Sequence, residues 1–418
     1  MIIAKRYYSG FPDAHDTYHA LSAAGDGKIY YVLSSVRYNV GAQFYVYDPV
    51  TDQTKFIADL SEALGEKEKK CIVQGKSHVE FCEHDGKLYF STHIGYYEMI
   101  NGSECMPVNA PSGYQLYPGG HFVAYDMRSG KIEDLALAPH GEGIITMTMD
   151  KQRGHLYGIT WPVGYLLHYD LNTHQLKELG LVNERGEAGV IGKDYRVICR
   201  SMFVDPRDGN AYYTTAEGDI FRYRAGLPAP EKLMDVDMRL DYFGSYDYTR
   251  AGSGSYNWRK IWWHEPENMA YGVHGNSGYL FRFDPKAPKI EIVERFTSEP
   301  SRKSGMFDQF SYGYLGFKIG ENQTIYYLTG APIYRNGKRV KGVDRLAGGG
   351  SKGLEHLHLV TYHIPEKKYM DHGPIFYEDG SIPTYVNAIA MDRLGNIYTL
   401  ARFMHEGVEI EDLVKISL

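Results

Sequence analysis

The sequence has few cysteines and no long apolar run, and each absence excludes a class of protein. Four cysteines in 418 residues show neither metal-like spacing nor the pattern of a disulfide framework. No apolar stretch approaches the ~20 residues that a transmembrane helix needs, and the opening MIIAKRYYSG is too polar for a signal peptide. We therefore expect no membrane partner. We expect a cytoplasmic protein as the sequence is written, or a periplasmic or secreted one if a leader was removed.

The chain also lacks an excess of positive charge. Its formal net charge is −7, from 45 Lys and Arg against 52 Asp and Glu, which argues against a general nucleic-acid-binding protein. An anionic ligand would therefore need a local basic pocket. The abundant residues are glycine, with 46, and tyrosine, with 37, and hydrophobic residues make up 43% of the chain. This composition indicates a globular, aromatic-rich protein with a sizeable core.

A four-strand unit recurs along the whole chain. Its second strand is rich in tyrosine, as in DGKIYYVLS, DGKLYFSTH and DGNAYYTTA, and its third is aromatic and ends near Asp. The repeats are marked by Tyr30, Tyr89, Tyr157, Tyr212, Tyr271, Tyr326 and Tyr398. Seven such repeats predict an all-β fold, a seven-bladed β-propeller that forms a single domain over residues 1–418. The last repeat ends after its third strand, so we expect the N-terminal strand to join that blade and close the ring. An eight-bladed propeller or a β-sandwich is the alternative.

Residues 75–98, GKSHVEFCEHDGKLYFSTHIGYYE, predict a hairpin in which two histidines meet. The Asp-Gly pair at 85–86 favours a type I′ turn, which needs positive φ at both central residues. Paired positions in such a hairpin have a constant sum, so His78 and His93 are expected to be direct cross-strand partners. Glu80 lies on the same face, where it would either hydrogen-bond an imidazole and raise the pKa of that histidine or merely pair with Ser91 or water. Two ordinary surface histidines are the alternative.

The channel mouth is the expected place for a site, because the first strand of each blade begins there and the second strand ends there. The predicted mouth positions are rich in His, Arg, Tyr and Trp, and Glu217 is the one carboxylate we expect among them. Arginine binds carboxylates bidentately and aromatic rings suit sugar rings, which favours an anionic sugar as ligand. The predicted substrate-binding residues are His19, Arg37, Trp161, Arg259, His274, Arg335 and Arg402. Trp258, Trp262 and Trp263 are more typical of packing between blades.

The shortage of carboxylates at the mouth disfavours an ordinary glycosidase, which needs two of them beside the scissile bond. β-Elimination from a uronic acid has other needs. A cation must neutralise the carboxylate, a base must take the C5 proton and an acid must protonate the leaving oxygen. A histidine pair with nearby Arg and Tyr meets those needs, because the pKa of histidine lies near neutrality. We therefore predict an enzyme that cleaves an acidic oligosaccharide by elimination.

The sequence resembles the seven-bladed propeller polysaccharide lyases, including ulvan lyases and rhamnose–glucuronate lyases, with related propeller α-L-rhamnosidases. In residues the resemblance rests on GKSHVEF…GKLYFSTHIGYYE and on the later arginine of YRVICRSMFVDP. It implies that His78 and His93 are the catalytic histidine pair and that Arg200 binds the substrate carboxylate. These lyases carry a catalytic Tyr and then an Arg in the next blade. Here that region has no Tyr at the strand start and has Trp161 where the Arg would be, so Tyr165 in the following loop is the candidate tyrosine.

Two other functions stay open, a propeller hydrolase such as an α-L-rhamnosidase and a non-catalytic glycan-binding or scaffold propeller. The repeats are longer than the roughly 40 residues usual in scaffold propellers, which favours an enzyme. The sequence requires no cofactor. The HLH at 356–358 places two histidines on one strand face, which leaves a structural or channel metal ion open, and nothing in the chain indicates the oligomeric state.

Overall fold

The computed structural model shows an all-β protein. It describes residues 2–100, 103–249, 255–275, 277–303, 316–332, 334–336, 338–339 and 355–418. Helices in this part of the chain are single turns: α1 (Leu60–Ala63), α2 (Glu299–Arg302), and the 3-10 turns at Lys67–Lys69, Pro139–Gly141, Gly186–Ala188, Asp241–Phe243 and Glu265–Glu267. None of these helices is long and apolar enough to cross a membrane.

Five sheets have four strands each, as expected from the repeats. The first two consist of β2 (Leu21–Ala23), β3 (Ile29–Leu33), β4 (Gln43–Asp48) and β5 (Gln53–Asp59), and of β6 (Cys82–His84), β7 (Lys87–Ser91), β10 (His121–Asp126) and β11 (Ile132–Leu137). The third and fourth consist of β12 (Gly143–Asp150), β13 (His155–Trp161), β14 (Tyr165–Asp170) and β15 (Gln175–Leu181), and of β16 (Phe203–Asp205), β17 (Asn210–Thr214), β18 (Asp219–Tyr223) and β19 (Glu231–Asp237). The fifth consists of β20 (Lys260–His264), β21 (Met269–Val273), β22 (Tyr279–Asp284) and β23 (Lys289–Arg295).

The remaining long strands form one eight-stranded sheet. Its order is β24 (Phe317–Ile319), β25 (Thr324–Pro332), β28 (Glu355–His363), β29 (Lys368–Tyr377), β1 (Ile2–Arg6), β32 (Val408–Ile416), β31 (Ile397–His405) and β30 (Ala390–Met391). The N-terminal strand β1 pairs antiparallel with β32, with Ala4 opposite Ile416, and parallel with β29. The predicted pairing of the N-terminal strand with the last repeat is therefore confirmed.

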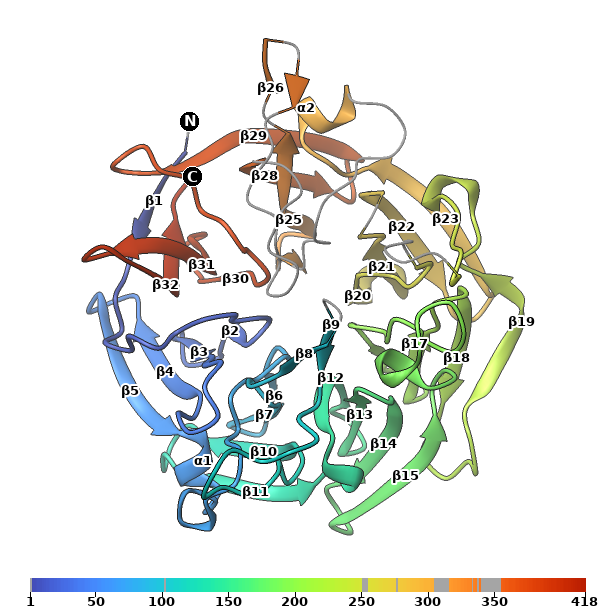
Figure 1. Cartoon of the computed structure of the whole chain (residues 1–418). Helices are drawn as coiled ribbons and strands as arrows, with labels where there is room; N and C mark the ends of the chain where they lie inside the picture. Colours follow the sequence, from blue (N-terminus) through green and yellow to red (C-terminus); the bar gives the residue numbers. More distant parts are fainter. Residues whose placement is uncertain are drawn as a thin grey trace.

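Figure 1 shows these sheets arranged around a common centre, consistent with a β-propeller. The first strands of successive sheets are neighbours, since β12 contacts β16, β16 contacts β20 and β20 contacts β24. Two small ribbons are added to this plan: β8 (Glu98–Ile100) with β9 (Ser103–Cys105), and β26 (Tyr334–Arg335) with β27 (Lys338–Arg339). The first ribbon extends the connection between β7 and β10.

The core lies between neighbouring sheets and is largely aromatic. Of the tyrosines that mark the repeats, all are buried except the half-buried Tyr326. Apolar residues on the two faces of each sheet pack against the next sheet, and burying such area is the main favourable term in folding. Trp258 is fully buried and donates a hydrogen bond from Nε1 to the Ser201 carbonyl, 2.7 Å away, so its predicted packing role is confirmed.

The strand ends meet at one face as expected. Gly143, at the start of β12, pairs with Trp161, at the end of β13, and Lys260, at the start of β20, pairs with Val273, at the end of β21. Residues just outside these pairs therefore gather around the centre of the molecule.

Candidate functional site

Two cavities lie at the centre, and two side chains line both of them. We call the smaller, of about 50 Å³, the mouth chamber. It is lined by Tyr18, Lys76, His78, His93, Tyr97, Glu104, Ile145, Trp161, Glu187, Arg200 and Tyr385. We call the larger, of about 520 Å³, the inner cavity; it lies among β12, β16, β20 and the residues that precede β6. His78 and Arg200 line both cavities and therefore separate them.

The hairpin that carries the two histidines follows the predicted register only near its turn. Asp85 and Gly86 have φ of 48° and 72°, and Cys82 pairs with Tyr89 as predicted. At the open end, however, His93 pairs with Lys76, through N–H···O bonds of 2.8 and 2.9 Å, and not with His78. The expected direct pairing of the histidines is wrong, because residues 77–81 leave the ladder and add two residues to one strand.

The two imidazoles still meet, through their rings. The ring centroids of His78 and His93 are 4.6 Å apart with the planes at 75°, an edge-to-face contact. The ring of Tyr18 also lies against His78, with the ring centroids 4.3 Å apart. Both histidines are buried, with 6% and 1% of their surface exposed, so they are not ordinary surface residues. Neither ring nitrogen of His78 has a hydrogen-bond partner in the part of the chain that the structure describes.

Both histidines are neutral at neutral pH. Burial lowers the pKa of His78 well below its usual value, and the neighbouring His93, Lys76 and Arg200 lower it further. Burial, Lys76 and Arg200 do the same to the pKa of His93. The positive charge of the site therefore resides on lysine and arginine, and an uncharged imidazole nitrogen is left as a base.

Lys76 and Arg200 supply the cations. Lys76 is almost fully buried; its Nζ lies 4.0 Å from Oδ2 of Asp16 and 4.8 Å from the ring centre of Tyr97. Arg200 lies between the cavities, where its Nη2 is 2.7 Å from Oε1 of Glu187 and its Nη1 donates a hydrogen bond to a backbone carbonyl. Each cation is held by a carboxylate on one side and faces the chamber on the other.

Tyr18 was not among the predicted residues. The sequence pattern pointed to its neighbour His19. The two residues lie just before β2, with a bend at His19, and Tyr18 lines the mouth chamber while His19 lines the inner cavity. Burial raises the pKa of Tyr18, against the effects of Arg259 and Arg200 and a hydrogen bond with Arg259. Because DTYHA forms no strand, the repeat pattern gave no signal for Tyr18.

The mouth chamber also contains two carboxylates that were not predicted. Glu104 belongs to β9, and burial raises its pKa, with Lys76 opposing this and Asp16 and Glu187 adding to it. Glu187 accepts hydrogen bonds from Nε1 of Trp161, at 2.8 Å, and from the Ile198 amide, at 3.0 Å. Both lie in insertions outside the four-strand repeat, so the repeat pattern gave no signal for them.

Glu217, the one carboxylate expected at the mouth, does not line the chamber. It forms an ion pair with Arg196 and accepts a hydrogen bond from Asn183. Its position near the end of β17 was predicted, but its side chain is occupied by these partners beside the chamber.

Trp161 and Arg402 keep predicted places around the centre. The Trp161 ring lies 5.5 Å from the ring of His93 and lines the chamber. Arg402 is buried, and its guanidinium lies 4.0 Å from the ring centre of Tyr385 and 2.5 Å from Asp16. Arg402 therefore supports the chamber wall and does not line it.

Tyr165 does not lie where the lyase resemblance requires. It lines neither cavity; its ring packs against His140 at 4.5 Å, and it pairs with Leu181 at the start of β14. The third strand of a sheet lies farther from the centre than the first two, so a side chain there does not reach the channel. The expectation that Tyr165 is the catalytic tyrosine is corrected on this geometry.

Two other predicted residues, Arg37 and His274, are not brought to the chamber. Arg37 is exposed and forms an ion pair with Asp13 at 2.5 Å. His274 is buried and bonded to Ser277 Oγ and the Ser255 carbonyl, at 2.8 and 3.1 Å. The side chain of Arg335 lies outside the described residues.

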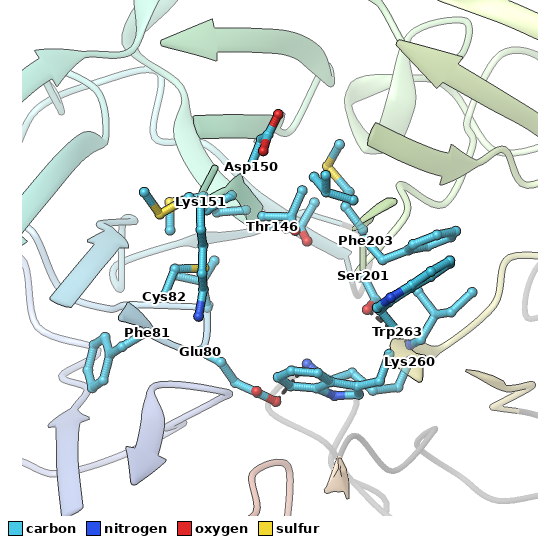
Figure 2. A pocket seen from close by; sticks show the side chains of 18 of the residues that line it. Glu80, Phe81, Cys82, Thr146, Asp150, Lys151, Ser201, Phe203, Lys260 and Trp263 are labelled. Carbon is cyan, nitrogen blue, oxygen red and sulfur yellow. Dashed lines mark hydrogen bonds and ion pairs between the residues drawn. The ribbon is translucent and has the colours of Figure 1, made fainter. Parts of the chain in front are cut away.

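Glu80 faces the inner cavity and not the histidines (Figure 2). Its Oε1 is 2.8 Å from Nζ of Lys260, and its Oε2 is 3.8 Å from Nζ of Lys318. The predicted carboxylate–imidazole bond is therefore wrong, because lysines of two other sheets reach Glu80 first. Trp262 and Trp263, predicted to pack between blades, also line this cavity.

The structure gives no support to a metal site among the residues it describes. No group of three or more His, Cys, Asp or Glu side chains there could hold a metal ion. Nδ1 of His358, one of the two HLH histidines, is 2.9 Å from Asp371, and His356 packs against Phe376.

Comparisons with known proteins show the fold and no family. No family model matches the chain, and no curated protein matches its sequence. Among solved structures it is similar to a streptogramin B lyase, with 10% identity over 100% of this chain and 98% of the other and a TM-score of 0.53. It is also similar to a chain of a mitotic checkpoint complex, with 9% identity over 99% of this chain and 92% of the other and a TM-score of 0.52. Such low identity supports a propeller-like fold alone.

Proposed function

We propose that this protein is a carbohydrate-active enzyme that cleaves uronate-containing oligosaccharides by β-elimination in the mouth chamber. One observation carries the proposal: the neutral imidazole of His78 packs against the rings of Tyr18 and His93, beside the cations Lys76 and Arg200. A neutral base next to fixed positive charge is what removal of a proton α to a carboxylate requires.

The scaffold of this proposal is a seven-bladed propeller. Five blades are the four-stranded sheets. The eight-stranded sheet divides at the parallel pairing of β29 with β1 into two further sets of four strands, β24–β25–β28–β29 and β1–β32–β31–β30. The second set closes the ring with the N-terminal strand.

Each step of the elimination is assigned to a side chain that already has the charge which the step requires. Arg200 and Lys76 bind the uronate carboxylate and neutralise it. Neutral His78 takes the C5 proton, the C4–C5 double bond forms and the C4–O bond breaks. Tyr18, whose pKa is raised and which is therefore protonated, gives its proton to the leaving oxygen. A chamber of about 50 Å³ admits a carboxylate and not a sugar ring, so the ring lies over its entrance.

A glycoside hydrolase is the second candidate, and the two carboxylates of the chamber favour it. Glu104 has the raised pKa of a general acid, and Glu187 is held by Arg200. A pair of carboxylates beside the scissile bond is the machinery of hydrolysis. In this scheme His78 and Tyr18 would bind the sugar.

Product analysis separates the two candidates. The protein is incubated with a panel of acidic oligosaccharides, and new ultraviolet absorbance and the mass of the products are followed. Elimination yields an unsaturated uronate that absorbs, and its mass is that of the saturated sugar less one water. A saturated product would establish the hydrolase, and no cleavage of any acidic glycan would leave a binding protein and refute both enzymes.

A further inference from the structure

Lys151 and Lys260, which the proposed chemistry does not use, line the inner cavity, and a third lysine, Lys318, approaches Glu80 from outside that lining. Lys260, on β20, and Lys318, on β24, approach Glu80 from two sheets, with Nζ to carboxylate distances of 2.8 and 3.8 Å. Lys151, which follows β12, directs its side chain into the same cavity (Figure 2). Three ammonium groups therefore gather around one carboxylate.

The other charges of this cavity do not restore neutrality. Asp150 lines it but lies 3.2 Å from Nη1 of Arg153, and Arg200 is paired with Glu187. Glu265 is exposed at the cavity rim. Lys151 is exposed as well, so among the residues that the structure describes the buried part of this group, Lys260 and Lys318 against Glu80, has an excess of one positive charge.

This excess is costly where it is buried. Only 8% of the Lys260 side chain and 19% of the Lys318 side chain are exposed. Burial lowers the pKa of Lys318, and the charges of Lys260 and Lys151 oppose the support that Glu80 gives. Like charges in a poorly hydrated cavity repel, and a bound anion would relieve the repulsion.

The wall that faces the lysines is apolar and aromatic. It is formed by Met147, Met149, Met202, Phe203 and Trp263. Nζ of Lys318 also lies 4.9 Å from the ring centre of Trp262, at the boundary between the two walls. A volume of about 520 Å³ is in the range of sites for small organic ligands, which are mostly apolar with a few placed polar groups.

We propose that the inner cavity is a second site, which binds a small organic carboxylate whose ring or chain packs on the apolar wall. The carboxylate lies against Lys151 and Lys260, which line the cavity, and Lys318 adds its charge from beside Glu80. The inference is independent of the chemistry in the mouth chamber, because it uses neither the histidines nor Tyr18. Phenylacetate has the required charge and apolar ring and serves as the probe.

The test is calorimetric titration of the full chain with phenylacetate, with its uncharged analogue 2-phenylethanol and with sulfate. Phenylacetate should bind at least about tenfold more tightly than the alcohol, because the lysines recognise its charge, and more tightly than sulfate, because the apolar wall recognises its ring. Lys318→Met should weaken phenylacetate binding about tenfold or more, by removing one cation. Glu80→Gln should tighten it, by removing the competing carboxylate.

Two controls keep the test specific. Lys131→Met removes an exposed lysine that pairs with Glu133 on the outer face of a sheet, and should leave the affinity for phenylacetate unchanged. Tyr165→Phe changes a ring that lines neither cavity and should also leave the affinity unchanged. A change in either control would mean that the probe binds elsewhere.

Opposite signs for Lys318→Met and Glu80→Gln are the signature of charge recognition. Loss of affinity in both variants would show a structural role and refute the proposal, as would equal affinity for phenylacetate and 2-phenylethanol, or for phenylacetate and sulfate. If Lys318→Met does not fold, the proposal is tested by measuring proton uptake when phenylacetate binds to the wild-type protein. Binding next to a lysine of lowered pKa should take up protons at alkaline pH, seen as a dependence of the binding enthalpy on the buffer, and no uptake would overturn the proposal.

Discussion

The phenol ring of Tyr18 lies 4.3 Å from the imidazole ring of His78, between the first and second sheets of the chain. Each side chain shields the other from solvent, and burial shifts the two pKa values in opposite directions, that of Tyr18 upward and that of His78 downward. A protonated acid and an unprotonated base therefore stand side by side at neutral pH. Divergent pKa values in neighbouring groups are the usual mark of an acid–base pair.

Tyr18→Phe tests whether Tyr18 is the general acid that protonates the leaving oxygen. The variant keeps the ring that packs on His78 and removes only the hydroxyl, so we expect normal thermal stability and a loss of turnover of about a hundredfold or more. The measurement is the turnover of an acidic oligosaccharide by the variant and by the wild-type protein. Tyr165→Phe is the matched control and should keep full activity, because that ring lies against His140 away from both cavities. Loss in the control and not in Tyr18→Phe would restore Tyr165 as the catalytic tyrosine.

His78→Ala should abolish turnover, and His93→Ala should lower it by about a hundredfold. Because burial and nearby cations lower the pKa of both histidines below 6.5, the base stays unprotonated into the acid range, and the acidic limb of the pH–rate profile should lie below pH 6.5. Glu80→Gln should leave that limb in place, because Glu80 contacts lysines and not an imidazole. A limb above pH 6.5, or near wild-type turnover in His78→Ala, would contradict the assignment.

Arg200→Lys tests recognition of the carboxylate. Lysine keeps the charge but loses the fork that contacts both Glu187 and the Ile198 carbonyl. We expect turnover on the native uronate to fall about tenfold to a hundredfold, with a much smaller effect on the carboxyl-reduced substrate. Arg196→Lys, at an arginine paired with Glu217 outside the chamber, is the matched control. An equal response of the two substrates would show that Arg200 does not bind the carboxylate.

Glu104→Gln distinguishes the elimination scheme from the hydrolase scheme, because only the hydrolase scheme uses this carboxyl group. In the elimination scheme the glutamine replaces a carboxyl that takes no part in proton transfer, so turnover should stay within about threefold of wild type. In the hydrolase scheme the general acid is lost and turnover should fall about a hundredfold or more. The rate of product formation on the substrate identified above is the measurement.

His121 should make stability depend on pH in the alkaline range. Burial lowers the pKa of His121, but hydrogen bonds with Asp134 and Glu66 outweigh this effect and raise the pKa to about 9. A folded-state pKa above the unfolded value of 6.5 means that the stabilisation is present below pH 6.5 and is lost as the pH rises to about 9. The loss should be at most about 3 kcal/mol by linkage. Urea unfolding at pH 6 and pH 9.5 measures it, and His121→Asn should show a smaller difference; equal differences would contradict the assignment.

Local and periodic signals predicted most of the strands. The Asp-Gly turn at 85–86 determined the register of its hairpin as far as Cys82 and Tyr89, because a two-residue turn needs positive φ at both positions. The N-terminal strand was predicted to join the last repeat, and its pairing with β32 follows from the missing fourth strand of that repeat. Arg200 and the two histidines reached the centre because their positions follow the repeat.

The site itself depended on contacts between sheets, which no local pattern encodes. The bulge at residues 77–81 replaced His78 with Lys76 as the partner of His93. Glu80 found its partners on β20 and β24, far along the chain. Tyr18 and not His19 lines the mouth chamber, in a segment before β2 that forms no strand.

The sequence by itself determined the repeated strands and the kinds of side chain that gather at the centre, because backbone periodicity and turn chemistry act within a few residues. Only the tertiary structure decided which acid meets which base. Glu104 and Glu187 come from insertions outside the repeat, and they reach the chamber through the folding of those loops over the sheets. The pKa values of Tyr18 and His78 diverge because the packed sheets exclude water from both, and the chain acquires that burial only when distant segments come together.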